Sequence, residues 1–301
     1  MAYPASPRRR RIDLRLAVIR TGMPMPLIAM NREMGSLGKD VARGLEQALG
    51  LKVRHHEIID QLASRARIRK SHVVSFLEGT QGLFERLAID QARLRIFTAD
   101  QILSLAEMNG GVILRGWGAT ALLKEVPHAV RVCVTAPRAV RIRRMMRRLE
   151  EEDPKKVARI VDQNDEAGRA VMRRHFHIDT RDVTEYDVAF NTDRISVEQC
   201  IDEIAALVKS GPFAETAESR AKLHDVAAAH HVLAALRTDV STSHCKVRVS
   251  AAAGRLTLEG VVTADAQRNA CADIASRIKG FAVLENLLQV AHAPVRLHGE
   301  G

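Results

Sequence analysis

The segment that decides the fold runs from Leu27 to Leu49 and reads LIAMNREMGSLGKDVARGLEQAL. Its first four residues are apolar and have the length of a buried strand. A turn with two glycines follows, and apolar side chains then recur at helical spacing up to Gly50, where we expect the helix to end. A strand, a glycine-rich turn and a helix in this order are typical of a loop that binds phosphate, because the helix start presents N–H groups to an anion.

The alternation of strand and helix continues along the chain. Short apolar runs typical of buried strands lie at 51–54, 111–116, 130–134 and 188–191. Helical patterns separate them, and the longest spans about 57–108. Strands that alternate with helices predict a parallel sheet covered on both faces. Residues 25–209 are therefore expected to form an α/β domain with a three-layer core.

The pattern changes after a polar linker at 210–220. A helix is expected at about 221–236, followed by two strands with period-two alternation, a second helix and a last strand. This αββαβ order predicts a small α+β domain over 221–292. The domain has few polar side chains of catalytic type, which favours binding over catalysis. The segments 1–24, which is basic, and 293–301 are expected to be tails.

The composition indicates a two-domain globular protein with an anionic partner. The chain has 301 residues, of which 46% are hydrophobic and 27% charged, and its formal net charge is +10. Aromatic residues make up only 3%, which argues against readers of single-stranded nucleic acid. The four cysteines show no zinc or disulfide spacing. The pattern predicts neither a secretory signal nor a membrane-spanning helix, so we expect a cytoplasmic protein.

The glycine-containing turn matches the Walker A phosphate loop only in part. Gly38 and Lys39 are in place, whereas Glu33 stands at the first glycine and Asp40 at the serine or threonine. We predict that the backbone binds the donor phosphates and that Lys39 reaches the outer ones. A glycine-containing helix start without a ligand is the alternative. The predicted loop consists of Gly35, Ser36, Leu37, Gly38, Lys39 and Asp40.

The segment NREMGSLGKD at 31–40 is similar to the degenerate phosphate loop of the cytidylate kinase-like family, a branch of the P-loop nucleoside monophosphate kinases. Further family motifs follow in order, namely HEII at 56–59, VILRGWGA at 112–119, the alanine–proline and arginine pattern at 136–144 and YDVAFNT at 186–192. The resemblance covers about 26–209. It implies a kinase core that uses ATP and Mg²⁺, with a helical insert that binds the monophosphate and a lid that carries arginines.

Several arginines fit the chemistry that the resemblance implies, because phosphoryl transfer needs positive groups around the transferring phosphate. Arg141, Arg144 and Arg148 share a stripe of a helix expected after Pro137. Arg169 belongs to a second basic set in the lid. Of these, Arg141, Arg144 and Arg169 are the strongest candidates. We assign these three residues, with Lys39, to catalysis. The alternative is a solvated basic face with ion pairs along the helix.

Other polar residues are candidates for binding the acceptor and the base. Arg115 ends a predicted strand at the carboxyl edge of the sheet, so we favour a monophosphate contact over a structural ion pair. Glu57 and Asp60 orient the acceptor, or else are exposed helix carboxylates. Asn191 and Thr192 end the last strand, where they border the adenine or form a plain turn.

The Mg²⁺ ion has two candidate ligands in the loop. Asp40 replaces the hydroxyl that usually holds the metal, and its carboxylate either binds Mg²⁺ directly or repels the phosphates. Ser36 is the candidate substitute.

The C-terminal segment resembles a BON domain. The stretches GRLTLEGVV at 254–262 and GFAVLENLLQV at 280–290 carry the resemblance, which covers about 221–292. Such domains are associated with binding to phospholipid surfaces or other ligands, including small molecules. This association implies a sensory or tethering role, and the residues leave the ligand open.

The sequence therefore predicts an ATP-dependent kinase that acts on nucleoside monophosphates, with a C-terminal ligand- or membrane-binding module. The family name alone suggests CMP as the acceptor. One alternative is a degenerate nucleotide-binding sensor that signals through the BON domain, which Asp40 and the missing first glycine favour. A third hypothesis is an adaptor for nucleic acid or membrane, and it depends on the net positive charge. We expect no specific nucleic-acid partner, and the oligomeric state stays open.

Overall fold

The computed structural model describes residues 26–54, 57–66, 68–78, 90–108, 110–116 and 118–291. The side chains of residues 57, 58 and 76–78 are outside this description, as are the expected tails at 1–24 and 293–301. His56 and Trp117, which belong to two of the sequence motifs, also fall outside it.

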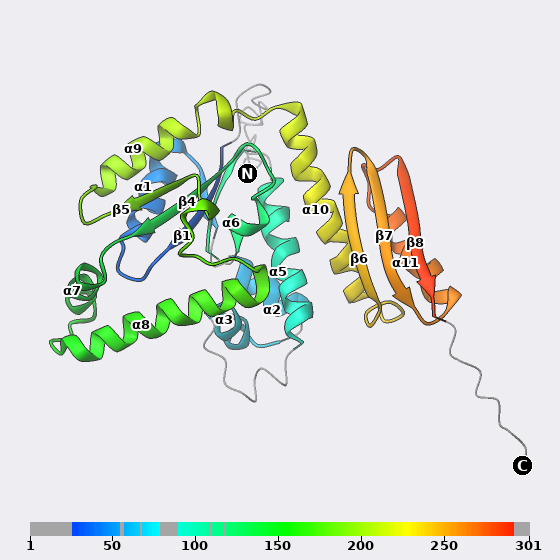
Figure 1. Ribbon diagram of the computed structural model, residues 1–301, viewed down its shortest axis with the longest axis horizontal. Coiled ribbons are helices and arrows are strands. Elements are labelled where there is room, and N and C mark those ends of the chain that lie inside the picture. Colours follow the sequence, from blue (N-terminus) through cyan, green and yellow to red (C-terminus); the bar gives the residue numbers. More distant parts are fainter. Residues whose placement is uncertain are drawn as a thin grey trace, which may run out of the picture.

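A five-stranded parallel sheet forms the core of the larger domain (Figure 1). The strands are β1 (Leu27–Arg32), β2 (Lys52–Arg54), β3 (Val112–Arg115), β4 (Ala129–Thr135) and β5 (Val188–Asn191), in the order β2-β3-β1-β4-β5. Leu27 and Ala29 of β1 enter one apolar core, whereas Ile28 and Met30 enter the other. Because both faces of the sheet are covered, the first four residues of β1 are all apolar and buried. The predicted α/β class is confirmed.

Helices cover the two faces of this sheet. Helices α1 (Gly38–Leu49) and α9 (Val197–Leu207) pack on one face, and α2 (Glu57–Ala66) and α5 (Gln91–Ala106) pack on the other. The helical stretch expected at 57–108 is divided, because α3 (Lys70–Glu78) is separated from α2. The chain continues through α6 (Ala119–Leu122), α7 (Arg138–Leu149) and α8 (Pro154–Val171), and short helical turns lie at Met172–Phe176, Val183–Glu185 and Gly211–Phe213. Among the helices of the described residues, none has the length and apolar character that crossing a bilayer requires.

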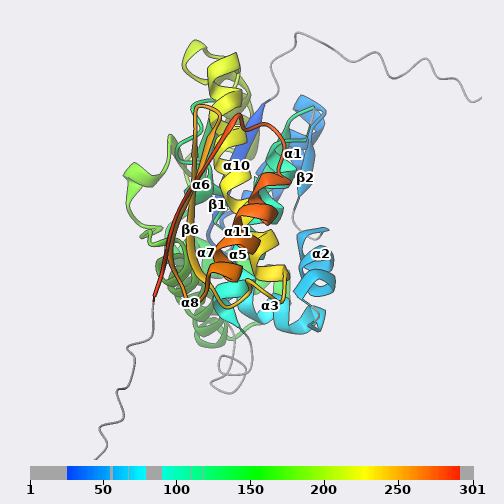
Figure 2. The ribbon, with the colours of Figure 1, turned by 90° about the vertical axis from the view of Figure 1, so that its right-hand side faces the viewer.

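The second domain contains a three-stranded sheet with two helices on one face (Figure 2). Its elements are α10 (Ala217–Thr238), β6 (Lys246–Ala252), β7 (Arg255–Val262), α11 (Asp265–Ser276) and β8 (Val283–Val290). Strands β6 and β7 are antiparallel, and β8 runs parallel to β7. The hairpin turns at Ala253 and Gly254, both of which have positive φ, as a tight primed turn requires. The expected αββαβ order is confirmed.

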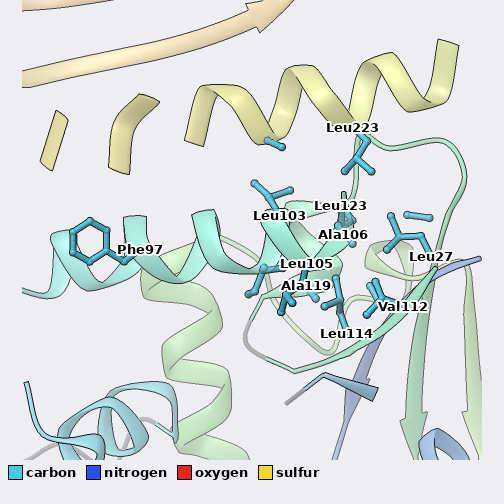
Figure 3. Close-up of a cluster of buried hydrophobic side chains, with 14 of the residues drawn as sticks. Leu27, Phe97, Leu103, Leu105, Ala106, Val112, Leu114, Ala119, Leu123 and Leu223 are labelled. Atoms are coloured by element: carbon cyan, nitrogen blue, oxygen red, sulfur yellow. The ribbon is translucent and has the colours of Figure 1, made fainter. Parts of the chain in front are cut away.

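Helix α10 belongs to both domains. It begins at Ala217, inside the segment expected to be a linker, and its side chains enter two cores. Leu223 and Ala227 pack into the core that contains α5, whereas Val232 and Leu236 pack under the small sheet. Figure 3 shows Leu223 pointing from α10 into the cluster that contains Leu123 and Ala106. The two domains are therefore joined by a shared buried helix.

A network of charged side chains lies in the same contact between α10 and α5. The imidazole of His231 bridges Asp100 of α5 and Glu107, the residue that caps the C-terminal end of α5. Its Nδ1 lies against Asp100 and its Nε2 lies 3.0 Å from Glu107. His224 Nδ1 lies 3.0 Å from the other oxygen of Glu107. Hydrogen bonds to Asp100 and Glu107 raise the pKa of His231 to about 9. Burial alone would raise the pKa of Glu107, but its hydrogen bonds with His231 and His224 outweigh burial and lower it.

The apolar part of this contact predicts that a substitution in the C-terminal domain destabilises the larger domain. Leu223→Ala removes a buried side chain that is 5% exposed, so we expect the free energy of unfolding to fall by about 2 to 4 kcal/mol. Val240→Ala, at a position 88% exposed, is the control and should change it by less than about 0.5 kcal/mol. Urea unfolding followed by circular dichroism measures both, and equal effects would contradict the shared core.

The polar part predicts a pH dependence of stability. Because the pKa of His231 is raised on folding, its contribution is fully present below the unfolded value of about 6.5 and is lost as the pH rises through about 9. We expect His231→Gln to cost on the order of 1 to 3 kcal/mol at pH 6 and much less at pH 9.5. Urea unfolding at both pH values tests this. A penalty that does not change with pH would show that His231 is neutral in the folded protein.

Candidate functional site

The bend between β1 and α1 contains two residues in the left-handed region. Gly35 has φ of +79° and Leu37 has φ of +63°, and α1 begins directly after Leu37. In the described part of the chain, the N–H groups of Leu37, Gly38 and Lys39 donate to no acceptor. Such N–H groups at a helix start attract anions, because the helix dipole points the same way. The bend therefore presents backbone N–H donors in the arrangement that the predicted phosphate loop requires.

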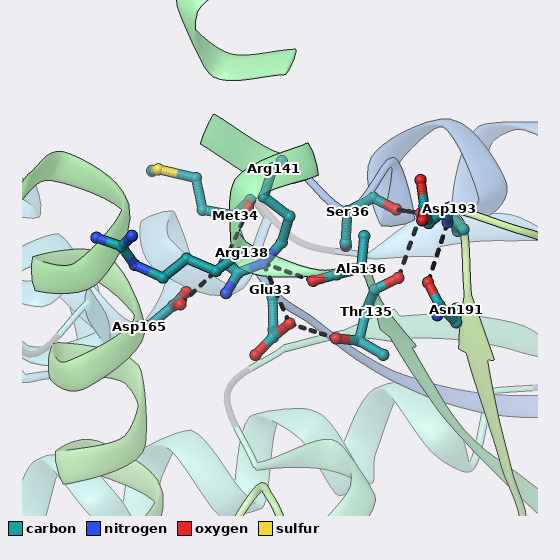
Figure 4. A network of polar contacts seen from close by, with 12 residues as sticks. Glu33, Met34, Ser36, Thr135, Ala136, Arg138, Arg141, Asp165, Asn191 and Asp193 are labelled. Atoms are coloured by element: carbon teal, nitrogen blue, oxygen red, sulfur yellow. Dashed lines mark hydrogen bonds and ion pairs between the residues drawn. The ribbon is translucent and has the colours of Figure 1, made fainter. Parts of the chain in front are cut away.

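Helix α7 presses against this bend. A Cβ atom on Gly35 would lie 2.8 Å from the carbonyl oxygen of Arg141, so only glycine fits there. The guanidinium of Arg141 is buried and donates to the carbonyl oxygens of Ala136 (3.0 Å) and Met34 (3.2 Å). It also pairs with Glu33 at 3.3 Å and with Asp165 of α8 at 2.8 Å (Figure 4). Arg141 thus links the bend, α7 and α8.

A second arginine connects the bend to the end of β5. Arg144 donates to the hydroxyl oxygen (2.9 Å) and the carbonyl oxygen (2.8 Å) of Thr192 and lies 3.4 Å from the carbonyl oxygen of Gly35. The buried Thr192 hydroxyl donates to the carbonyl oxygen of Ser36 at 2.9 Å. Asn191 is exposed, and its side-chain oxygen accepts from the N–H of Asp193 at 3.0 Å. The structure thus brings both predicted base-site residues beside the loop, with Thr192 fixed to it.

A cavity of about 510 Å³ lies over the bend. Two carboxylates, Glu33 and Asp40, line it together with a larger set of cations. The cations are Arg32, Lys39, Arg43, Arg144, Arg147 and Arg148. This excess of positive charge in a concave site attracts polyanions. The cavity joins the predicted Lys39 and Arg144 in one site.

Two oxygen donors in this region are suitable for Mg²⁺. The side chain of Ser36 is fully buried, and its hydroxyl has no hydrogen-bond partner among the described residues. Asp40 is exposed in the first turn of α1 and lines the cavity. In the described ranges, no group of three or more His, Cys, Asp or Glu side chains is arranged to hold a metal. A Mg²⁺ ion here would therefore depend on phosphate oxygens for much of its coordination, as is usual in kinases.

The predicted acceptor residues lie on β3 and α2, next to the β1 side of the loop. Arg115 is 7% exposed at the end of β3, and it neighbours the end of β1, where Arg32 stands. Burial and the nearby charge of Arg32 lower the pKa of Arg115. Two adjacent cations at the carboxyl edge of a sheet favour an anion beside them. Asp60 is exposed on α2 and pairs with Lys70 at 2.8 Å, and Glu57 begins α2 with its side chain outside the description.

The predicted lid residue Arg169 lines a separate cavity of about 320 Å³ under α8. Arg169 pairs with Glu166 at 2.9 Å. This second cavity and the one over the bend share Arg32 and Glu33, so the two meet at the loop. Arg115 lines neither of them. The cavity lined by Arg169 and the cavity lined by Lys39 therefore meet at the start of the loop.

The cavity residue Arg43 was not assigned from the sequence. It follows Lys39 by four residues on α1, as Arg148 of the predicted arginine stripe follows Arg144 on α7. Residues at this spacing lie on one face of a helix. Helical spacing from Lys39 is thus the signal that identifies Arg43.

The comparisons with known proteins identify two regions. The sequence profile of the cytidylate kinase-like family matches residues 27–194, and that of the BON domain matches residues 224–292. A search of the curated proteins found no match.

Three solved structures are similar to this chain. An uncharacterized protein from Eubacterium ventriosum is 18% identical, with 62% of this chain and 99% of that chain covered and a TM-score of 0.49. Shikimate kinase from Bacteroides thetaiotaomicron is 18% identical, with coverage of 62% and 99% and a TM-score of 0.39. Deoxyadenosine kinase from M. mycoides with bound dATP is 9% identical, with coverage of 61% and 100% and a TM-score of 0.36. Because the family profile spans more than half of its residues, the chain belongs to the cytidylate kinase-like family, with a BON domain following the kinase-like region.

Proposed function

We propose that this protein transfers the terminal phosphoryl group of ATP to a nucleoside monophosphate. The observation that carries the proposal is the cavity over the bend, where backbone N–H groups meet six cationic side chains. Phosphoryl transfer is catalysed mainly by positioning and positive charge, which this cavity offers. Membership of the kinase-like family supports the same reaction. The family name suggests CMP as the acceptor.

In this proposal the bend binds the donor. The N–H groups from Leu37 to Lys39 hold the donor phosphates, and the Lys39 ammonium binds the outer ones. Arg144 already contacts the loop and also lines the cavity, so it can stabilise charge on the transferring group. Arg141 is held by Glu33 and Asp165, which supports a role in joining the loop to the lid. To touch phosphate it would first have to leave these carboxylates.

The acceptor occupies the other side of the loop in this proposal. Arg115 and the neighbouring Arg32 would bind the monophosphate, and α2 with Glu57 and Asp60 would form the wall beside its base. Arg169 would approach the transferring group when α8 closes. Asn191 and Thr192 would border the base of the donor.

Ser36 and Asp40 would hold Mg²⁺ together with the phosphate oxygens. The ion, when bound, neutralises charge on these oxygens. A cytoplasmic setting, expected from the sequence, suits these substrates. The BON domain would add a binding site for a phospholipid surface or a small molecule.

A second candidate function is a nucleotide-binding sensor without turnover. It is favoured by Asp40, whose carboxylate lines the phosphate cavity at the position where other P-loops carry a hydroxyl. A carboxylate there repels phosphate when no metal lies between them.

The kinase proposal predicts that Lys39→Ala removes activity without unfolding the protein. We expect MgATP and CMP to yield ADP and CDP in a coupled assay, and the variant to lower kcat/KM by on the order of 100-fold, because a cation at the phosphates is lost. Lys209→Ala, an exposed lysine after α9, is the matched control and should retain activity. Other nucleoside monophosphates are tested in parallel.

Isothermal titration with MgATP separates the two candidates. Tight binding of ATP without transfer to any monophosphate would establish the sensor. Absence of both binding and transfer would overturn both candidates.

The buried Ser36 hydroxyl predicts opposite effects on stability and on binding. Ser36→Ala should leave the free energy of unfolding unchanged or raise it by up to about 1 kcal/mol, since a buried hydroxyl without a partner is removed. The same variant should weaken MgATP binding by about 10-fold. Thr192→Val, which removes a buried hydroxyl that is hydrogen-bonded, should instead destabilise by about 1 to 3 kcal/mol. Urea unfolding and calorimetry test both, and equal destabilisation would contradict the assignment.

A further inference from the structure

A buried carboxylate connects the C-terminal domain to the acceptor side of the proposed site. Asp100 of α5 is 3% exposed, and it contacts cations from two other helices. One is Arg65 at the end of α2, and the other is His231 of α10. A carboxylate buried this deeply is stable only when its charge is compensated and hydrogen-bonded.

The contact with Arg65 fixes the end of α2. The guanidinium of Arg65 donates to Asp100 and lies 4.8 Å from the centre of the Phe97 ring, one turn earlier on α5. Leu62 and Ala63 of α2 pack into the same core. The position of α2 therefore depends on α5 through both apolar and ionic contacts.

The contact with His231 comes from the face of α10 that enters this core. His231 lies four residues after Ala227 and eight after Leu223, which both pack against α5. Glu107, which caps α5, follows Asp100 by about two helical turns, so one imidazole bonds to both. His231 thus supplies the second cation that Asp100 requires.

We propose that Asp100 is a positioning residue for the acceptor, because it holds α2 in place through Arg65. His231 then connects the C-terminal domain to the acceptor side, because it pairs with the same carboxylate. This inference rests on the proposed function, which places α2 beside the acceptor. Without His231, Asp100 keeps one cation and moves towards solvent. Arg65 then moves with the carboxylate, and α2 is held less firmly against α5. The phosphate loop leads into α1, which packs against the other face of the sheet, so the loss of His231 does not affect it.

Hydrogen–deuterium exchange of the full-length protein tests the coupling without any need for activity. His231→Gln should accelerate amide exchange in residues 57–66 by about 10-fold and leave residues 38–49 of α1 unchanged. His224→Gln is the matched control, because His224 also bonds to Glu107 of α5 but does not touch Asp100. In an Asp100→Asn background, His231→Gln should add no further acceleration. Unchanged exchange in α2, or equal acceleration in α1 and α2, would overturn the proposal.

Steady-state kinetics supply the second readout. His231→Gln should raise the KM for the monophosphate by about 5-fold and leave the KM for ATP within about 2-fold. An unchanged acceptor KM despite faster exchange in α2 would overturn the positioning role. A protein that transfers no phosphate would refute the proposed function alone, because the exchange result still decides whether α10 holds α2.

Discussion

The structure depends on how one bend of the backbone is held in place. Between β1 and α1, the N–H groups of Leu37, Gly38 and Lys39 are found without acceptors in the described residues, and a left-handed Leu37 holds them there. A non-glycine residue in this region costs about 1 kcal/mol or more, so the surrounding structure must maintain it. Polar groups and strain of this kind gather at functional sites. The N–H groups and the cationic walls of the cavity both favour an anionic ligand.

The bend is maintained by groups that arrive from distant parts of the chain. Arg141 brings α7 and α8 to the loop, and Arg144 with Thr192 attaches the end of β5. These contacts are charge-assisted or buried, so they are strong enough to fix the loop before a ligand arrives. The same residues lie beside the cavity. The same contacts therefore shape the loop and place charge around the cavity, so a change in α7 or α8 would alter both.

The sequence predicted the fold well because its signals are local. A four-residue apolar run and glycines at the turn define β1 and the loop, and family motifs supply the order of the rest. The site was predicted only in part, since Lys39 and Arg144 share a cavity whereas Arg115 lines neither of the two cavities at the loop. The pairing of Asp100 with His231 joins residues 131 positions apart and leaves no periodic pattern. The burial of α10 between two domains could not be predicted from the sequence either, because its apolar side chains belong to two different cores.

The central claim is that the bend at the end of β1 binds the phosphates of a nucleotide. A crystal structure of the full-length protein with Mg²⁺ and a non-hydrolysable ATP analogue tests it most directly. The account predicts phosphate oxygens within hydrogen-bond distance of the N–H groups from Leu37 to Lys39, with the Lys39 ammonium on the outer phosphates. A nucleotide bound elsewhere, with the bend unchanged and Lys39 directed to solvent, would contradict it.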